Sequence, residues 1–397
     1  MRISTATFQN NAVSQMDALE AALQQTQLQL STGLKIQSAA DDPAGMAQVN
    51  QMNVEISATT QFVTNSNTAQ TNLQLEEQAL SNASNIMQNA NTLAVEANNS
   101  ALSAANKHDI ATQLQQDLQS LVSIANSTDG NGNYLFGGFA NTSAPFTQAG
   151  GAVSYNGTNQ VTQVQISTNQ SVSTGDNGNV AFMNIPNGNG TFTTSAASTN
   201  TGTASIGGGS VTTPSAWVPG TYTLSFTDPS DYQVTDSGGN VVSSGTYTNG
   251  DTLSFNGAQV ALSGTPAAGD QFTLAPSTTT SAFSALSNLI STLNSSATIN
   301  SGQLTTLVNT AVQQIQNSIT NFSNVSASVG ARLNAITAAQ SSATSTQTTL
   351  KTNVGTIQST DYTAATTQLS TEELALQAAQ ESYASLEKLS LFNYIQG

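Results

Sequence analysis

Side chains that could carry out catalysis are scarce in this chain. His108 is the only histidine and cysteine is absent, which excludes a Cys/His pair, a multi-histidine metal site and a zinc–sulfur site. His108 stands beside Lys107 and Asp109 at an expected helix start, where a solvated side chain is the simplest interpretation.

Two acidic motifs remain, and both have structural explanations. The run DGNGN that begins at Asp129 imitates the start of an EF-hand loop, but Tyr134 and Ala140 stand where that motif needs Gly and Glu. Asp41 and Asp42 could form an acid/base pair, but they precede a proline, and a carboxylate there caps a helix. We therefore expect no catalytic, cofactor-binding or metal-ligating residue.

The charge of the chain bears on its partners. With 22 acidic and 6 basic side chains, the net charge of -16 repels phosphate, so neither nucleic acid nor an anionic membrane is expected as a partner. Only 7% of residues are charged, a composition that favours an exported surface protein over a cytosolic enzyme. The opening MRISTATFQNN has no apolar run typical of a Sec signal peptide, and no stretch is apolar enough to insert into a membrane.

A heptad repeat near the C-terminus predicts the element that organises the fold. Apolar residues recur every seven positions, which indicates a long helix in a left-handed supercoil, roughly 75 Å in length. These residues are Val308, Ile315, Phe322, Val329, Ile336, Ala343, Leu350 and Ile357. A weaker heptad frame over residues 49–94, after a helix start at Pro43, predicts its partner helix. A third helix is expected from Asp109 to Asn126, and helix resumes near Ser281.

The two ends of the chain carry helical apolar stripes of their own. The first helix is expected to end at Gly33, and the last covers residues 361–395. Exposed apolar groups on such helices would promote aggregation in a monomer, so we expect these stripes to await a partner. The candidate assembly residues are Leu19, Leu23, Leu30, Leu376, Tyr383, Leu386 and Phe392.

Between the helical segments lies β-type sequence. Residues 126–139 form a glycine- and asparagine-rich turn with a small aromatic core, and its motif residues are Asp129, Gly130, Tyr134, Phe136 and Gly137. Residues 140–280 hold acidic but no basic residues, and short alternating runs such as GTYTLSF predict hairpin strands. They form one small β domain, or two if residues 194–210 divide them.

Four separated motifs give the chain a family resemblance. The opening MRIST, the linker STGLKI…AADDPAG, the turn NSTDGNGNYLFGGF…PF and the ending DY…AATTQL…SLFNYI occur in the order found in the flagellin superfamily. Within that superfamily they resemble the proteins of the hook–filament junction most. The resemblance covers residues 1–146 and 300–397.

The resemblance implies a mixed α and β fold, with a long α-helical coiled-coil bundle built from both chain ends and an inserted all-β outer region. Residues 1–40 and 360–397 would form an inner coiled coil, 41–139 and 281–359 the helical bundle, and 140–280 the outer domain or domains. It further implies type III export, a cytosolic chaperone on the C-terminal helix, and assembly with further copies, a neighbouring hook-associated protein and flagellin. The protein would be a secreted, extracellular structural subunit that joins the flagellar hook to the filament.

The sequence is also compatible with other functions. The chain could be a filament-forming flagellin, which would assemble into long filaments by itself. It could be an adhesin, with Trp217 and nearby tyrosines of the β region as a stacking platform for a glycan, although a single tryptophan is more often part of a core. An enzyme would have to depend on His108.

Overall fold

The computed structural model describes residues 5–395 of the 397-residue chain, and the side chains of residues 7–385. The chain forms two compact units. Unit 1 comprises residues Met1–Val63 and Gln340–Gly397, and unit 2 comprises Thr64–Ala339. Two long helices, α2 (Pro43–Ala97) and α5 (Ser301–Gln358), contribute residues to both units.

Unit 1 is helical, and its first helix ends and its second helix begins where the sequence predicts. The first helix, α1 (Thr5–Thr32), ends before Gly33, whose positive φ of 72° closes the helix. Asp42 caps α2, since its Oδ1 accepts hydrogen bonds from the backbone N–H groups of Ala44 and Gly45 at 3.1 and 3.0 Å. The last helix, α6 (Tyr362–Ile395), follows α5 after a short turn.

The two turns of unit 1 pair with each other. The backbone N–H of Lys35 donates to the carbonyl of Gln358 at 2.6 Å, and that of Thr360 donates to the carbonyl of Gly33 at 3.0 Å. Asp41 accepts backbone hydrogen bonds from Ser38 and Gln37 in the same region, and these lower the pKa of its carboxyl. Both carboxylates of the Asp41–Asp42 pair therefore serve backbone groups.

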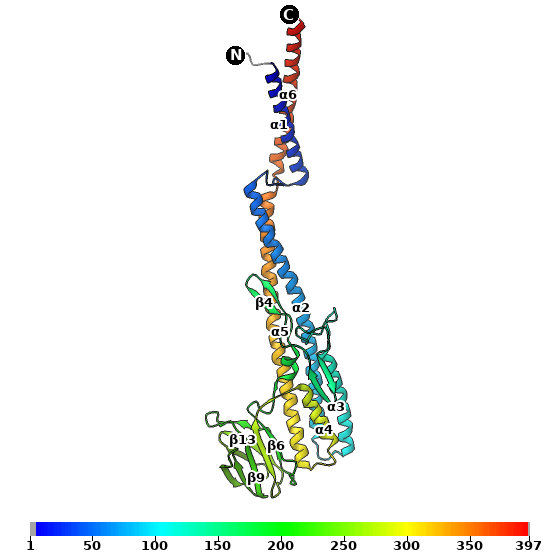
Figure 1. Ribbon diagram of the computed structural model, residues 1–397, viewed down its shortest axis with the longest axis vertical. Helices are drawn as coiled ribbons and strands as arrows, with labels where there is room; N and C mark the ends of the chain where they lie inside the picture. Colours follow the sequence, from blue (N-terminus) through cyan, green and yellow to red (C-terminus); the bar gives the residue numbers. More distant parts are fainter. Residues whose placement is uncertain (1–4, 396–397) are drawn as a thin grey trace. The chain divides into compact units, whose positions relative to one another are not determined.

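Unit 2 contains the helical core. Two shorter helices, α3 (Ala104–Ala125) and α4 (Ala282–Asn294), pack beside each other (Figure 1). The expected start of the third helix at Asp109 is wrong, because Ser103 caps α3 instead: its hydroxyl accepts the backbone N–H of Asn106 at 3.2 Å. The apolar faces of the helices meet in one buried cluster, whose residues lie between Ala69 and Ile336 in the sequence.

The first half of the β-rich stretch packs onto this helical cluster. It consists of two hairpins, a π-helical turn and a short strand that pairs with a strand from the end of the stretch, and its aromatic residues belong to the helical core. The elements are β1 (Phe146–Ala149), β2 (Ala152–Tyr155), β3 (Gln163–Ser167), β4 (Gln170–Ser173), η1 (Asn179–Met183), β5 (Ile185–Pro186) and its partner β15 (Thr279–Thr280).

The second half forms a single β domain with its own buried cluster. A five-stranded antiparallel sheet has the order β11-β10-β9-β14-β6, and a smaller sheet joins β12, β13, β7 and β8. The strands are β6 (Phe192–Ala196), β7 (Ser205–Ile206), β8 (Ser210–Val211), β9 (Tyr222–Asp228), β10 (Asp231–Thr235), β11 (Val241–Thr246), β12 (Thr252–Phe255), β13 (Ala258–Ser263) and β14 (Gln271–Pro276). Residues 194–210 do not divide two domains, since they supply strands to this one.

Carboxamide side chains of α5 hold the β-rich stretch. The amide of Gln303 donates to the carbonyls of Ser198 and Asn200 at 2.9 and 3.1 Å, and Asn317 donates to those of Pro186 and Gly188 at 2.9 and 2.8 Å. Each such bond satisfies a loop carbonyl that would otherwise lose its water partner. The predicted fold class, long helices from both chain ends with a central region of small antiparallel sheets, is confirmed.

Candidate assembly surface

The end helices of the chain lie side by side in unit 1. They run antiparallel, so the start of α1 and the end of α6 lie at the same end of the hairpin (Figure 1). The predicted assembly residues with described side chains are all half-buried: Leu19, Leu23, Leu30, Leu376 and Tyr383. Leu386 and Phe392 belong to α6, but their side chains lie outside the described residues.

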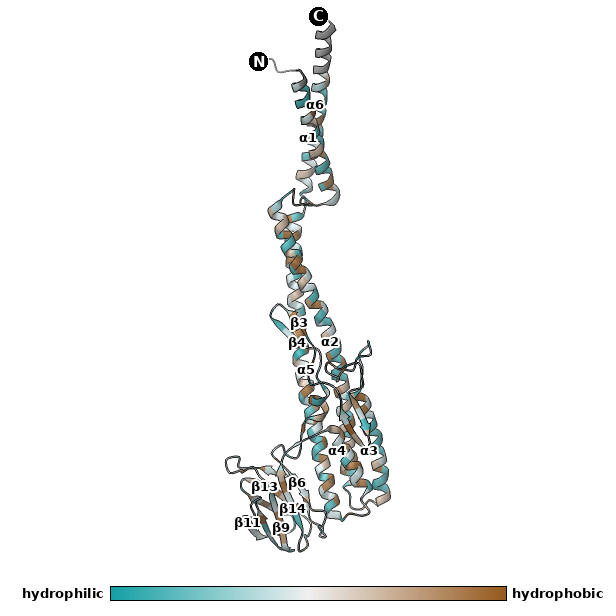
Figure 2. Ribbon diagram, viewed as in Figure 1, coloured by the Kyte–Doolittle hydropathy of each residue, from teal (hydrophilic) through white to brown (hydrophobic). Residues whose placement is uncertain are grey.

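The hairpin also leaves apolar side chains in water. Leu28 is 51% exposed and Leu374 is 68% exposed, and Phe8 and Val13 are exposed as well. Sequence reasoning missed these residues because they lie off the predicted stripes. The available signal was the weak separation of polar and apolar faces, which Figure 2 shows as interspersed colours along α1 and α6.

The interior of the hairpin is partly polar. Thr26 is buried, and the Oε2 atom of Glu372 is shielded from water without a hydrogen-bond partner. The other carboxylate oxygen of Glu372, Oε1, accepts a hydrogen bond from the Gln368 amide at 2.8 Å. These residues line an open pocket of about 380 Å³ together with Gln25 and Gln29. A polar, loosely filled interior stabilises a helix pair less than an apolar one does.

The heptad residues of α5 behave differently along the helix. Their side chains are buried in the half that belongs to unit 2, namely Val308, Ile315, Phe322, Val329 and Ile336. In unit 1, Leu350 and Ile357 are only half-buried. The residues of the same heptad repeat are therefore buried in a densely packed core in unit 2, whereas Leu350 and Ile357 stay half-buried in unit 1.

The turn after α3 is fixed by Asp129. Its Oδ1 accepts hydrogen bonds from the backbone N–H groups of Asn131 and Asn133 at 2.8 and 2.9 Å, and its Oδ2 accepts one from the Asn133 amide. Burial raises the pKa of Asp129, but these hydrogen bonds outweigh it and the net pKa is lowered. Gly130 is exposed at the tip of the turn. Among the described side chains, those of residues 7–385, no three His, Cys, Asp or Glu side chains converge as a metal site requires.

Aromatic rings join this turn to the helical core. Phe136 is fully buried, and its ring lies 5.0 Å from that of Phe182 in an edge-to-face arrangement. Gly137 next to it is buried, and a Cβ there would come within 2.8 Å of the carbonyl of Ala140. Tyr134 is half-buried, and its backbone N–H donates to the carbonyl of Asn141.

His108 and Trp217, the residues that an enzyme or an adhesin would need, each contact residues of the fold. His108 is exposed on α3, with its Nδ1 at 2.7 Å from the Oδ1 of Asn294. The half-buried Trp217 packs against the β-domain core, its ring 5.4 Å from Phe192 and 5.7 Å from Tyr222. The arrangement of Trp217 favours the core over the stacking platform.

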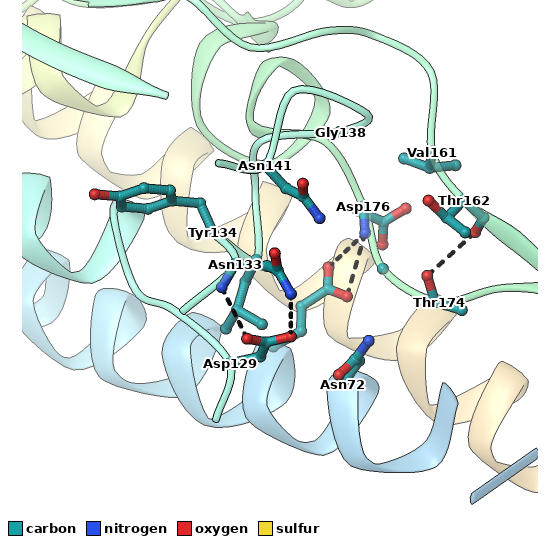
Figure 3. Close-up of a pocket in the computed structure, with 13 residues that line it drawn as sticks. Asn72, Asp129, Asn133, Tyr134, Gly138, Asn141, Val161, Thr162, Thr174 and Asp176 are labelled. Carbon is teal, nitrogen blue, oxygen red and sulfur yellow. Dashed lines mark hydrogen bonds between the residues drawn. The ribbon is translucent and has the colours of Figure 1, made fainter. Parts of the chain in front are cut away.

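A buried carboxyl of α2 is a feature that sequence reasoning missed. Glu76 is 1% exposed, and both of its oxygens accept the backbone N–H of Asp176 at 3.2 Å. Burial first, and then the charge of Asp176, raise the pKa of Glu76 to about 8, while Arg332 opposes the shift. Figure 3 shows Asp129 and Asp176 in the pocket that Glu76 also lines. No local pattern marks Glu76, because a segment 100 residues away buries it.

Comparisons with known proteins give these surfaces a context. A family model described as the bacterial flagellin N-terminal helical region matches residues 3–141. A second, described as the D2-like domain of flagellar hook-associated protein 1, matches residues 195–276, which is most of the β domain. No helix in the described part of the chain is long and apolar enough to cross a bilayer.

Curated relatives agree with these matches over part of their length. Flagellar hook-associated protein 3 of Salmonella typhimurium is 30% identical over 185 residues, which is 47% of this chain and 58% of that protein. The chain thus spans less than two thirds of the length of the curated relatives it matches.

Solved structures match over longer regions. The flagellar junction protein FlgL of Legionella pneumophila is 29% identical, with a TM-score of 0.71 over 79% of this chain and 100% of that one. FlgL of Xanthomonas campestris is 36% identical, with a TM-score of 0.71 over 77% of this chain and 99% of that one. With this identity over nearly the whole of a solved relative, the chain belongs to the flagellar hook-associated protein 3 (FlgL) family.

Proposed function

We propose that the chain is a structural subunit that joins the flagellar hook to the filament and assembles through its end helices. The observation that carries the proposal is the α1–α6 hairpin, whose apolar side chains stay half-buried or exposed, as with Leu28 and Leu374. Burial of such side chains against neighbours contributes roughly 25 cal/mol per Å² of apolar surface. The family membership supports the site of action, since a relative of known structure is described as a flagellar junction protein.

The proposal assigns a layer to each part of the chain. Residues 1–40 with 360–397 form the inner coiled coil, residues 41–139 with 281–359 the bundle, and residues 140–280 the outer region. The neighbours are further copies of the chain, another hook-associated protein and flagellin. Before assembly the chain leaves the cell by type III export, with a cytosolic chaperone on α6. No catalytic step is part of this role.

The test is electron microscopy of a strain that lacks the gene, together with an assay for flagellin in the culture medium. Bare hooks, with flagellin lost to the medium and restored to filaments by the intact gene, are the expected result. Filaments that remain attached to hooks in the deletion strain would exclude the junction role. Hooks without secreted flagellin would instead indicate a role in export.

A further inference from the structure

The loop that leads from β4 to η1 contacts both long helices within unit 2. We call residues 174–178 the crossing segment. Its Asp176 donates its backbone N–H to Glu76 of α2, and the side chain of Asp176 pairs with the Arg332 guanidinium of α5. The carbonyl of Gly175 accepts a second bond from Arg332, at 3.2 Å. One carboxyl from α2 and one guanidinium from α5 therefore hold the crossing segment from two sides.

The crossing segment in turn holds neighbouring elements. Thr174 binds the carbonyl of Thr162 before β3, through its backbone N–H at 2.9 Å. The backbone N–H of Gly178 donates to the carbonyl of Phe136 in the turn motif, at 2.9 Å. A Cβ at Gly178 would lie 2.4 Å from the Phe146 ring, so only glycine fits there. Release of the crossing segment would loosen both the β3–β4 hairpin and the aromatic turn.

The balance of charge in this cluster depends on one proton. When Glu76 is protonated, Asp176 and Arg332 compensate each other and the cluster is neutral. When Glu76 is ionised, one buried negative charge has no counter-charge, which is costly in a site shielded from water. The remaining charged group that lines the pocket is Asp129 of the turn, whose lowered pKa keeps it ionised and adds to the repulsion.

We propose that Glu76, Asp176 and Arg332 form a proton-dependent latch, in which protonated Glu76 holds the crossing segment and the β3–β4 hairpin against α2 and α5. Opening exposes Glu76 to water, where its carboxyl returns to ordinary acidity and loses the proton. The latch is therefore tightest in acid and opens more readily as the pH rises toward the pKa of about 8 in the closed state. This inference does not depend on the junction role.

Hydrogen exchange of the full-length chain at about pH 6 and about pH 8 tests the latch. The readout is the protection of the Asp176 amide, corrected for the intrinsic effect of pH, in the wild type and in Glu76→Gln. Linkage predicts that the opening equilibrium of the wild type rises by roughly tenfold or more over this range, while that of Glu76→Gln stays constant. Glu96→Gln, the same change at an exposed position of α2, must behave as the wild type.

The outcomes separate cleanly. A wild-type protection factor that does not change between the two pH values overturns the proposal. So does a pH dependence that persists in Glu76→Gln. If Glu76→Gln loosens the segment at both pH values through altered packing, the pH dependence of the wild type alone decides. Arg332→Gln removes the counter-charge of Asp176 and is expected to raise exchange of the crossing segment at both pH values; unchanged exchange would exclude its part in the latch.

Discussion

Both units of the chain contain long helices, but the helices of unit 2 bury a large apolar core and those of unit 1 do not. Both buried hydrophobic clusters lie wholly within unit 2. The described side chains of unit 1 include few buried apolar ones, namely Ile36, Val49, Ala343 and Ala365. Yet unit 1 exposes Leu28, Leu374 and other large apolar groups. Unit 2 also exposes large apolar side chains, such as Phe139 and Val241, but it has in addition the buried core that unit 1 lacks.

From this difference we infer which unit stabilises the fold and which unit assembles with neighbours. Burying a large aliphatic or aromatic side chain contributes about 1.5 to 3 kcal/mol, and unit 2 gains that many times over. The ordering of long helices costs conformational entropy that the thin interior of unit 1 offsets poorly. We infer that unit 2 is stable by itself and that unit 1 gains its stability from neighbours.

The largest expected effect concerns the aromatic centre of unit 2. The fully buried ring of Phe182 lies within 5.7 Å of the rings of Phe136, Phe146, Phe283 and Phe322. Phe182→Ala is expected to destabilise the chain by about 3 to 5 kcal/mol, measured by urea unfolding. The matched change in unit 1, Phe8→Ala at a side chain that is 48% exposed, is expected to cost less than about 0.5 kcal/mol. Equal costs would refute the contrast.

A second substitution in unit 2, Glu76→Gln, is expected to stabilise the chain rather than destabilise it. Burial and the neighbouring Asp176 raise the pKa of Glu76 from 4.5 to about 8 on folding, so the chain must take up a proton at intermediate pH. The contribution of this group is fully present below pH 4.5 and is lost as the pH rises through 8. The variant is thus expected to be more stable than the wild type by on the order of 4 kcal/mol at about pH 8. A difference in the free energy of unfolding between the variant and the wild type that is the same at all pH values would contradict this prediction.

A helix cap in unit 1 should produce a smaller, local effect. Asp42→Ala removes two hydrogen bonds at the start of α2 and is expected to cost about 1 kcal/mol. Hydrogen exchange near residue 45 should then accelerate by roughly fivefold, since about 1.4 kcal/mol corresponds to tenfold, without change in unit 2. Asp17→Ala, at an exposed position of α1, is the control. Faster exchange throughout unit 2 would show that the units are not independent.

The heptad repeat made the helical part of the fold predictable. Seven-residue spacing identified Val308, Ile315 and Phe322 as buried from sequence alone, and Asp42 with Pro43 marked a helix start. Local signals were less reliable where two competed: both Ser103 and Asp109 can begin a helix, and the structure uses Ser103. The stretch 194–210 was expected to be a possible domain divider because it is rich in threonine and glycine. That composition does not reveal the backbone pairing that joins β7 to β13.

The functional surfaces were only partly predictable. The apolar stripes of α1 and α6 emerged from spacing, but exposure of Leu28 or Leu374 is a tertiary property and depends on what the other helix covers. The burial of Glu76 likewise depends on the crossing segment, to which no sequence period points. Periodicity reports which face a helix buries, and it does not report which distant loop covers a polar position.

The most direct test of the account is the assembly of Leu374→Asp in a strain that lacks the gene. This residue is 68% exposed, so the change should shift the free energy of unfolding by no more than about 0.5 kcal/mol. We predict secreted, folded protein and bare hooks. Val241→Asp, at a residue of β11 in unit 2 that is 52% exposed, should restore attached filaments. Attached filaments with Leu374→Asp would contradict the assignment of the α1–α6 hairpin as the assembly surface.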